Sequence, residues 1–369
     1  MIGDSEWPLG LAWLARELAR DLQRATRVAG GPEALWGSSS ARLASCLHAG
    51  SEVTERATRA RAAFRAADAQ EALGRIGVVH VPITRAEYPA RLRMIFDPPF
   101  GLFGSGSVVP ALARAEQAPV VGIVGSRRPS AAGRRLASDL AAGLAERGAV
   151  VVSGLARGID TAAHEGALDA AGITIAVLGS GVDRVHPRRN EALARRIEAT
   201  GALVSEYWPG TEPAPWRFPA RNRIVAGLCD AVVVVEAAAR SGALITADFA
   251  MENGTPVLAV PGWPGAELSV GCNALIRSGA ALCEGVEDVV AEVCHRSWRD
   301  PPARASAMGP AAQVLEAVSL APAGVDRIAT DCALSHADVA VALAALELDG
   351  LVAREPGGVF RAVVRNRLR

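Results

Sequence analysis

The stretch PVVGIVGSRRPSAAGRRLASDLAAGLAERGAVVVS, residues 119–153, decides the fold of this chain. It holds two short apolar runs, PVVGIV and GAVVVS, on either side of a helix-like segment. Continuous apolar runs of this length are typical of strands buried on both faces, as in a parallel sheet covered by helices. The stretch therefore predicts a strand–helix–strand unit of an α/β domain.

The alternation continues through GITIAVLG, GALVSE, DAVVVVEA, TPVLAV and AALCE, which are separated by helix-like segments. We therefore expect an α/β fold, with a doubly wound, extended Rossmann-like and mostly parallel sheet, over residues 76–297. One further strand, GVVHVPI, precedes these runs, and the Pro- and Gly-rich segment after it is expected to be a connection.

Helical segments flank this domain on both sides. Residues 1–75 carry apolar side chains near helical spacing and predict a small helical N-terminal domain. Residues 298–309 are expected to form a linker. Residues 310–369 contain three short helix-like segments and a hairpin that turns at 356–358, which predicts a winged helix-turn-helix domain.

Composition excludes several classes of protein. The chain has 369 residues, 50% of them apolar, and a mean hydropathy of +0.21, so wholesale disorder is excluded. Its formal net charge is zero, so an argument for nucleic acid must rest on where the charges lie. All 39 basic residues are Arg, which excludes lysine-dependent chemistry.

Neither a metal nor a membrane is expected. The six cysteines are scattered, without the spacing of a metal site, and are expected to be reduced and structural. The first residues lack the features of a secretory signal, and no apolar run reaches the roughly 18 to 20 residues of a spanning helix. We expect a soluble, cytoplasmic protein without a cofactor.

The residues that follow each apolar run are the candidates for a site, because ligands of doubly wound sheets bind beyond the carboxyl ends of the strands. Four of these segments bring arginines to that edge. They contain Gly125, Arg127 and Arg128; Gly154, Arg157 and Gly158; Arg184, Arg188 and Arg189; and Arg221, Asn222 and Arg223. Guanidinium groups gathered from separate loops favour an extended polyanion over a single phosphate.

Some of these positions have a plain structural alternative. The loop after Gly125 either presents unpaired helix amides to an anion or is a surface turn. His164 is expected to pack in the interior, since no nucleophile stands at a recognisable spacing. Internal pairing with Glu206 or Glu236 could satisfy one of the arginines in RFPARNRIVAGL, residues 217–228.

The motifs GIVGSRRPS, VVSGLARGIDTAAHEGAL, IAVLGSGVDRVHP, FPARNRIVAGL, VVVVEAAARSGALITADFA and AVPG with GCNALI occur in one order. In this order the chain resembles the DNA-processing protein A family (DprA, also called Smf) over residues 78–292. Its C-terminal part resembles that family's terminal winged helix. The resemblance implies a non-enzymatic, homodimeric binder of single-stranded DNA, which protects incoming strands and loads the RecA recombinase during natural transformation.

Carried over by motif, the resemblance places DNA contacts on ten residues of these loops. They are Gly125, Ser126, Arg127, Ser153, Gly154, Arg157, Gly158, Arg188, Arg221 and Arg223. We add Arg128 and Asn222, and also Ser241 and Gly242, which start a helix either as an amide nest or as a plain N-cap. No catalytic and no metal-binding residue is expected. His186 and Arg188 stand where the family commonly has Tyr and Lys, so positive charge is kept.

Two other functions remain open. One is cleavage of an N-glycosidic bond, as in the lysine-decarboxylase-like phosphoribohydrolases, which resemble one another in a PGGxGT loop where this chain reads AAARSGALIT. The other is a nucleotide sensor with the winged helix as its output. The chain lacks GxGxxG and GxxxxGK[ST], which argues against a dinucleotide or a triphosphate.

Two further expectations concern how DNA would be held. Aromatic residues make up 4% of the chain, so base stacking is expected to add little beyond Trp208, Trp216 and Phe218. The presumed recognition helix of the winged domain, SHADVAVALAALELDG, has three acidic residues and no Arg. We expect this domain to contact protein or its own chain rather than DNA.

Overall fold

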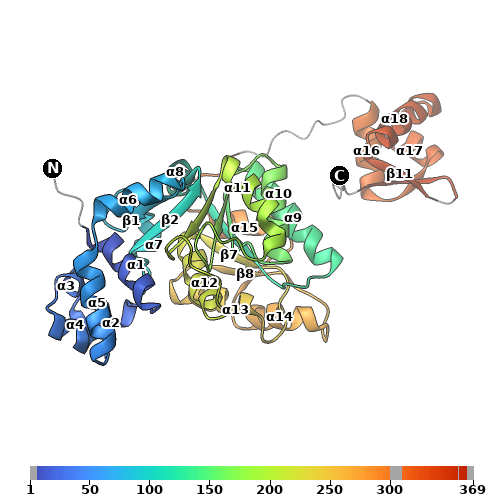
Figure 1. The fold of residues 1–369 in the computed structure, drawn as a ribbon. Coiled ribbons are helices and arrows are strands. Elements are labelled where there is room, and N and C mark those ends of the chain that lie inside the picture. Colours follow the sequence, from blue (N-terminus) through green and yellow to red (C-terminus); the bar gives the residue numbers. More distant parts are fainter. Residues whose placement is uncertain (1–5, 300–309, 356, 364–369) are drawn as a thin grey trace. The chain divides into compact units, whose positions relative to one another are not determined.

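The computed structural model describes residues 6–299, 310–355 and 357–363. The chain divides into two compact units, Met1–Arg299 and Asp300–Arg369 (Figure 1). The predicted linker lies almost wholly outside the described residues, and its boundaries stay a prediction.

A nine-stranded sheet organises the first unit, in the order β1-β2-β6-β5-β4-β3-β7-β8-β9. Strands β3 to β9 pair in parallel, while β2 pairs antiparallel with β1 and β6. The strands are β1 (Val79–Pro82), β2 (Gly101–Gly106), β3 (Val120–Val124), β4 (Val150–Ser153), β5 (Thr174–Val177), β6 (Ala202–Ser205), β7 (Ala231–Val234), β8 (Val257–Ala259) and β9 (Ala281–Leu282). The seven predicted apolar runs are the seven parallel strands, so the predicted fold is confirmed.

Strand β2 was predicted to be a connection. Its sequence GLFGSG lacks the β-branched residues that mark the other strands. Its glycines allow close packing: a Cβ at Gly104 would lie 2.5 Å from Val108, and one at Gly106 would lie 2.7 Å from the backbone of Glu198. The segment pairs as a strand because tertiary packing overrides its weak local preference.

Helices cover both faces of the sheet because the strand side chains alternate. In β3, Val120 and Val124 belong to one core cluster, and Val121 and Ile123 belong to another. The first face is covered by α7 (Ala90–Arg93), α8 (Val108–Gln117), α12 (Arg217–Leu228), α13 (Gly242–Glu252) and α14 (Val270–Arg277). The second is covered by α9 (Ala131–Glu146), α10 (Ile159–Asp169), α11 (Glu191–Thr200) and α15 (Val286–Glu292). Two short 3-10 helices, η1 (Arg188–Asn190) and η2 (Glu267–Ser269), precede α11 and α14.

Six helices precede the sheet and belong to the same compact unit. They are α1 (Trp7–Leu18), α2 (Gln23–Ala29), α3 (Pro32–Trp36), α4 (Ser40–Leu47), α5 (Ser51–Ala63) and α6 (Ala66–Arg75). Their own core joins the sheet edge through aromatic contacts, with the Trp208 ring 5.4 Å from that of Trp13 and 5.2 Å from that of Phe103. A separate helical domain ending at residue 75 stays a prediction.

The second unit is the predicted winged helix. Its elements are α16 (Pro310–Leu320), β10 (Ala323–Gly324), α17 (Val325–Asp331), α18 (His336–Leu348), β11 (Val352–Glu355) and β12 (Val359–Ala362). The strands pair antiparallel in the order β10-β12-β11, and the unit has a hydrophobic core of its own. Of the predicted turn, Pro356 lies outside the described residues, and Gly357 and Gly358 have φ of 92° and 76°.

Among the residues that the structure describes, no single helix has the length and apolar character needed to cross a membrane. One pair, α17 and α18, passes that test on length and composition together but is bent by 109°.

Candidate nucleic-acid interface

The loops after β3, β4 and β5 meet at the carboxyl edge of the sheet. The chain runs from β3 through β4 and β5 to β6 on one side, and β7 then pairs on the other side of β3. Connections that diverge in this way open a crevice beyond the strand ends. Most of the predicted site residues follow these strands or lie on α12, and Ser241 and Gly242 start α13 after β7.

The loop after β3 packs directly against the loop after β4. The amide of Ile159 donates to the carbonyl of Ser126 at 3.1 Å. Gly158 has φ of 85°, and a Cβ there would collide with the same carbonyl oxygen. A Cβ at Gly125 would lie 2.7 Å from the Ile159 side chain. The predicted glycines therefore bring two backbones together, a role only residues without a Cβ can fill.

A buried asparagine fixes the third loop to the second. The Nδ2 of Asn190, at the end of η1, donates to the carbonyl of Leu155 at 2.9 Å and to the hydroxyl of Thr161 at 3.0 Å. Asn190 was not among the predicted residues, because its pairing crosses two loops that are separated in the sequence. It holds the segment that carries Arg188 and Arg189 against the loop that carries Arg157.

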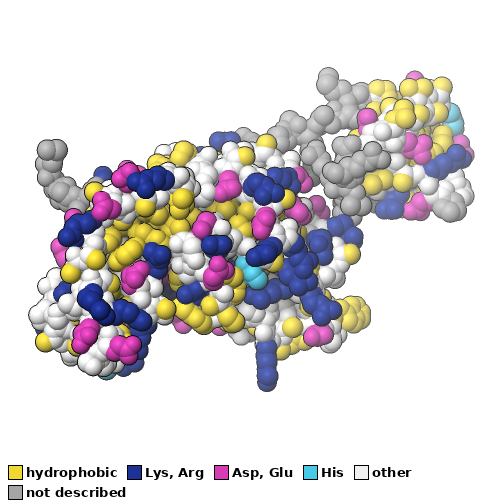
Figure 2. All heavy atoms as spheres, in the orientation of Figure 1, with side chains coloured by type: hydrophobic (Ala, Val, Ile, Leu, Met, Phe, Trp, Pro, Cys, Tyr) yellow, Lys and Arg dark blue, Asp and Glu magenta, His cyan; other side chains and the backbone are white. Residues whose placement is uncertain are grey.

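Five arginines on these three loops form what we call the arginine rim. They are Arg127, Arg128, Arg157, Arg188 and Arg189, and each is exposed. None has a carboxylate partner within the described part of the chain. Arg184, by contrast, pairs with Asp183 and Glu212. Figure 2 shows basic side chains gathered between the places where Figure 1 labels α10 and α13.

An aromatic ring lies within the rim. Phe218 is contacted by the guanidinium of Arg127, 5.8 Å from the ring centroid, and by the ring of His186, at 5.4 Å. Gly179 backs the same ring, since a Cβ there would lie 3.0 Å from it. The rim therefore combines cations with one aromatic face.

Arg221 is buried, contrary to the expectation that it contacts a ligand. It is 3% exposed, and one of its nitrogens donates to the carbonyl of Val177. Gly154 leaves room for its guanidinium, which a Cβ at that position would strike. Burial lowers the pKa of Arg221 to about 10, while nearby Asp160 acts in the opposite direction. Arg221 thus supports the loops from beneath.

Asp160 is the acidic group near Arg221 in this buried centre. Its carboxylate accepts the amides of Gly154 at 3.1 Å and Ala156 at 3.3 Å, which shapes the loop that carries Arg157. Burial raises the pKa of Asp160, opposed chiefly by Arg221 and by these two amides. The positive and negative charges are therefore desolvated together.

Arg223 and Ser153 are also buried, contrary to the expectation that they contact a ligand. Arg223 is 9% exposed and makes a two-pronged ion pair with Glu206, at 2.6 Å and 2.7 Å, which is one of the two internal pairings left open. Ser153 is fully buried and donates to the carbonyl of Ile123 at 2.6 Å. Both groups have protein partners, so neither side chain is available to a ligand.

The start of α9 already holds an anion. The Glu236 carboxylate, just beyond β7, accepts the Ser130 amide at 2.9 Å and hydroxyl at 2.6 Å. Gly133 lies so close that a Cβ would strike this carboxylate. The Ser130 amide at the start of α9 therefore has a partner already, because a neighbouring strand brings an acid to it.

The start of α13 is a plain N-cap. The Ser241 hydroxyl accepts the Ala243 amide at 3.3 Å, Gly242 is exposed with open space around it, and Asn222 donates to the Gly242 carbonyl at 3.2 Å. These three residues tie α12 to α13, beside the rim.

His164 packs in the interior, as predicted. Its Nδ1 lies 2.7 Å from the hydroxyl of Thr174, and burial lowers the pKa of His164 to about 3. Nothing in the described parts of the chain groups three or more His, Cys, Asp or Glu side chains around a possible metal.

The family model described as DNA recombination-mediator protein A matches residues 80–294. This chain belongs to that family. A second model, the DprA winged helix domain, matches residues 299–358. The first match covers all three loops of the arginine rim and α12.

Several members of the DprA family are similar along much of their length. A putative DNA processing protein DprA of Mycobacterium tuberculosis is 40% identical over 320 residues, 82% of each chain. Protein Smf of Escherichia coli is 38% identical over 292 residues, 76% of each chain.

Two solved DprA structures are similar in fold. The X-ray structure of DNA processing protein A from Streptococcus pneumoniae has a TM-score of 0.66 at 35% identity, covering 78% of this chain and 98% of the other. The protein from Helicobacter pylori has a TM-score of 0.53 at 28% identity and covers 59% of this chain and 96% of the other. The Helicobacter pylori structure gives insights into that protein's single-stranded DNA binding mode.

Proposed function

We propose that this chain binds single-stranded DNA along the arginine rim, protects incoming strands and helps load the RecA recombinase in natural transformation. One observation carries the proposal: five exposed arginines without acidic partners among the described residues come from three loops onto one edge. A phosphodiester chain supplies the negative charges that these groups lack.

The contacts follow from exposure. The rim side chains neutralise phosphates, and the loop backbone at Gly125, Ser126 and Gly158 lets the strand approach closely. Phe218 offers a ring to one base. Arg221, Arg223, Ser153 and Gly154 act from beneath by fixing the loops.

The salt dependence of binding tests the proposal. About three to five neutralised phosphates predict that log affinity falls with log salt at a slope of roughly −2 to −3.5 for single strands. The measurement is a filter-binding titration of the full chain with an unstructured oligonucleotide at several salt concentrations. A slope near zero, or no binding at low salt, would contradict the proposal.

We propose a binding rather than a catalytic role. The family favours the DNA-binding function over nucleotide cleavage, and Glu236, an acid at the sheet edge, is engaged at the start of α9. Incubating nucleoside monophosphates with the protein and measuring the free base tests this. Release of base at enzymatic rates would overturn it.

A homodimer and a contact with RecA complete the proposal, and both rest on membership of the family. Light scattering after size exclusion measures the first. For the second, RecA filament formation on strands already coated by a single-strand binding protein should begin sooner when this protein is added.

A further inference from the structure

A braced pair of aromatic rings lies at the end of the rim, on the connection between β6 and α12. The rings of Tyr207 and Trp216 are 6.3 Å apart at an interplanar angle of 89°. The guanidinium of Arg217 lies 5.1 Å from the Tyr207 centroid and 4.8 Å from the Trp216 centroid. One cation therefore contacts both rings, and their positions are mutually fixed.

Arg217 is held mainly by these rings. It donates to the carbonyl of Glu212, while its buried Nε has no hydrogen-bond partner among the described residues. Because this nitrogen is buried without a hydrogen bond to the described residues, stacking on the two rings is what holds the Arg217 side chain in position. Its contribution is to keep Trp216 in one orientation.

Trp216 nevertheless remains 50% exposed. The third aromatic that was expected near the site, Trp208, is only 8% exposed and packs on Trp13 and Phe103, so it has no face to offer. An indole that is rigid and half exposed is a ready surface for another flat apolar group.

The neighbourhood of Trp216 indicates which group that is. Trp216 immediately precedes α12, and Phe218, two residues later, contacts Arg127 of the rim. The connection that carries Trp216 follows β6, the neighbour of β5 in the sheet, so it leaves the same edge of the sheet as the rim loops. The group presented there is a nucleobase, which has a flat apolar face and is brought by a phosphate chain.

We propose that Trp216 is a stacking platform for an unpaired base of single-stranded DNA bound on the arginine rim. This inference rests on the proposed function and adds a subsite to it. Bases within a duplex have both faces covered, so this subsite favours single strands. It also depends weakly on which base is present, since every base has a π-face.

The test combines changes in the protein with changes in the DNA. Full-length wild type, Trp216→Leu and Trp216→Phe are titrated with an oligonucleotide and with a matched oligomer of abasic residues. Trp216→Leu keeps an apolar side chain against Arg217 but removes the aromatic face. It should weaken binding to the normal strand by about 5- to 20-fold and leave binding to the abasic strand unchanged, while Trp216→Phe restores most of the loss.

The salt dependence separates stacking from charge. Stacking releases no counterions, so the slope of log affinity against log salt should be the same for wild type and Trp216→Leu. Arg127→Gln is the comparison variant, because it should reduce the magnitude of the salt slope on both strands.

The outcomes distinguish the two proposals. Equal weakening on normal and abasic strands, or none on either, overturns the stacking inference while the proposed function stands. If the wild type binds neither strand, the proposed function itself fails. Urea unfolding of Trp216→Leu and Trp216→Phe, with midpoints near wild type, confirms that a binding change reports the ring and not the fold.

Discussion

Arginines of the same motif set have opposite roles in this protein, because their burial differs. Arg221 is buried beside Asp160, and Arg127 is exposed on the rim. Arg221→Gln removes a buried positive charge near the Asp160 carboxylate and disturbs the hydrogen bond to the Val177 carbonyl, which should cost about 1–3 kcal/mol. Arg127→Gln should change the free energy of unfolding by less than about 0.5 kcal/mol. Urea unfolding of both variants measures this, and equal stabilities would contradict the buried role of Arg221.

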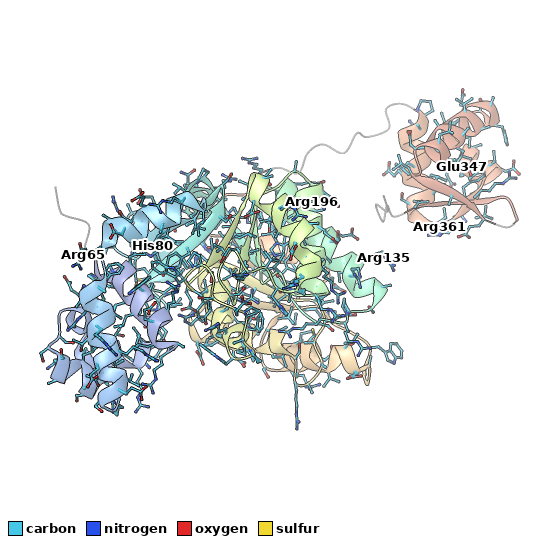
Figure 3. All side chains as sticks on the ribbon, viewed as in Figure 1. Arg65, His80, Arg135, Arg196, Glu347 and Arg361 are labelled. Carbon is cyan, nitrogen blue, oxygen red and sulfur yellow. The ribbon has the colours of Figure 1, made fainter. Side chains whose placement is uncertain are left out.

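Although Arg127→Gln should leave the free energy of unfolding almost unchanged, it should change DNA binding. Loss of one phosphate contact in Arg127→Gln lowers the magnitude of the salt slope by about 0.7. Arg196→Gln is the matched control, because Arg196 is exposed and pairs with Asp169, the last residue of α10, whereas the rim lies at the start of that helix (Figure 3). The same salt titration should give the wild-type slope for this control.

The acid sensitivity of the fold should depend on His164. Burial lowers the pKa of His164 from 6.5 to about 3, so between these values the unfolded chain binds a proton that the folded chain does not. The contribution of His164 to the free energy of unfolding is therefore fully present above pH 6.5. It is lost as the pH falls below that value, by up to about 1.4 kcal/mol per pH unit. His164→Gln should unfold in urea with a weaker pH dependence between pH 7 and 5. Identical pH profiles for the variant and wild type would count against this account.

Which side chains pair with one another was the part of the site that could not be predicted from the residue types. The abundance of Arg on the sheet edge follows from the sequence, because each arginine comes after an apolar run. Which arginine finds an acid is decided in three dimensions. Glu206 reaches Arg223 from the end of β6, and Glu236 reaches the start of α9 from β7. The first contact spans 17 residues of the chain and the second spans 106.

At the level of elements, the backbone contact between the first two loops should be sensitive to a single methyl group. Gly158→Ala forces a φ of 85° on a residue with a Cβ and drives that atom into the Ser126 carbonyl. We expect a loss of at least about 1–3 kcal/mol in stability and weaker DNA binding, because the loops must separate. Gly242→Ala is the control, since open space surrounds Gly242 at the start of α13. Thermal unfolding and filter binding of both variants test this, and a neutral Gly158→Ala would show that the loops do not depend on this contact.

Strong apolar patterns made the parallel strands predictable, whereas two strands with weak apolar patterns, β2 and β10, were not predicted. Six of the seven runs form strands that are buried along their whole length, whereas AALCE forms the two-residue, partly exposed β9. Strand β2, with three glycines in GLFGSG, and the two-residue β10 depend on their partners for pairing. No local signal could have identified either one.

At the level of the whole molecule, the two units should separate by function. The exposed side of α18 carries Val341 and Leu348, 72% and 89% exposed, and the acidic Glu347, which Figure 3 labels on this helix. Such a surface, on a helix without Arg or Lys, offers phosphates no cation. A fragment of residues 305–369 should give no tight gel shift with duplex DNA at physiological salt, whereas residues 1–299 should keep the single-strand affinity of the full chain. Tight duplex binding by the fragment would refute this.

The openness of the arginine rim determines which DNA molecules can bind. All five cations are exposed on loop surfaces, so a strand can be laid onto them sideways and lifted off again. Nothing needs to be threaded, and neither a 5′ nor a 3′ terminus is required. Covalently closed single-stranded circles and single-stranded gaps inside long duplexes should therefore bind as well as short linear strands.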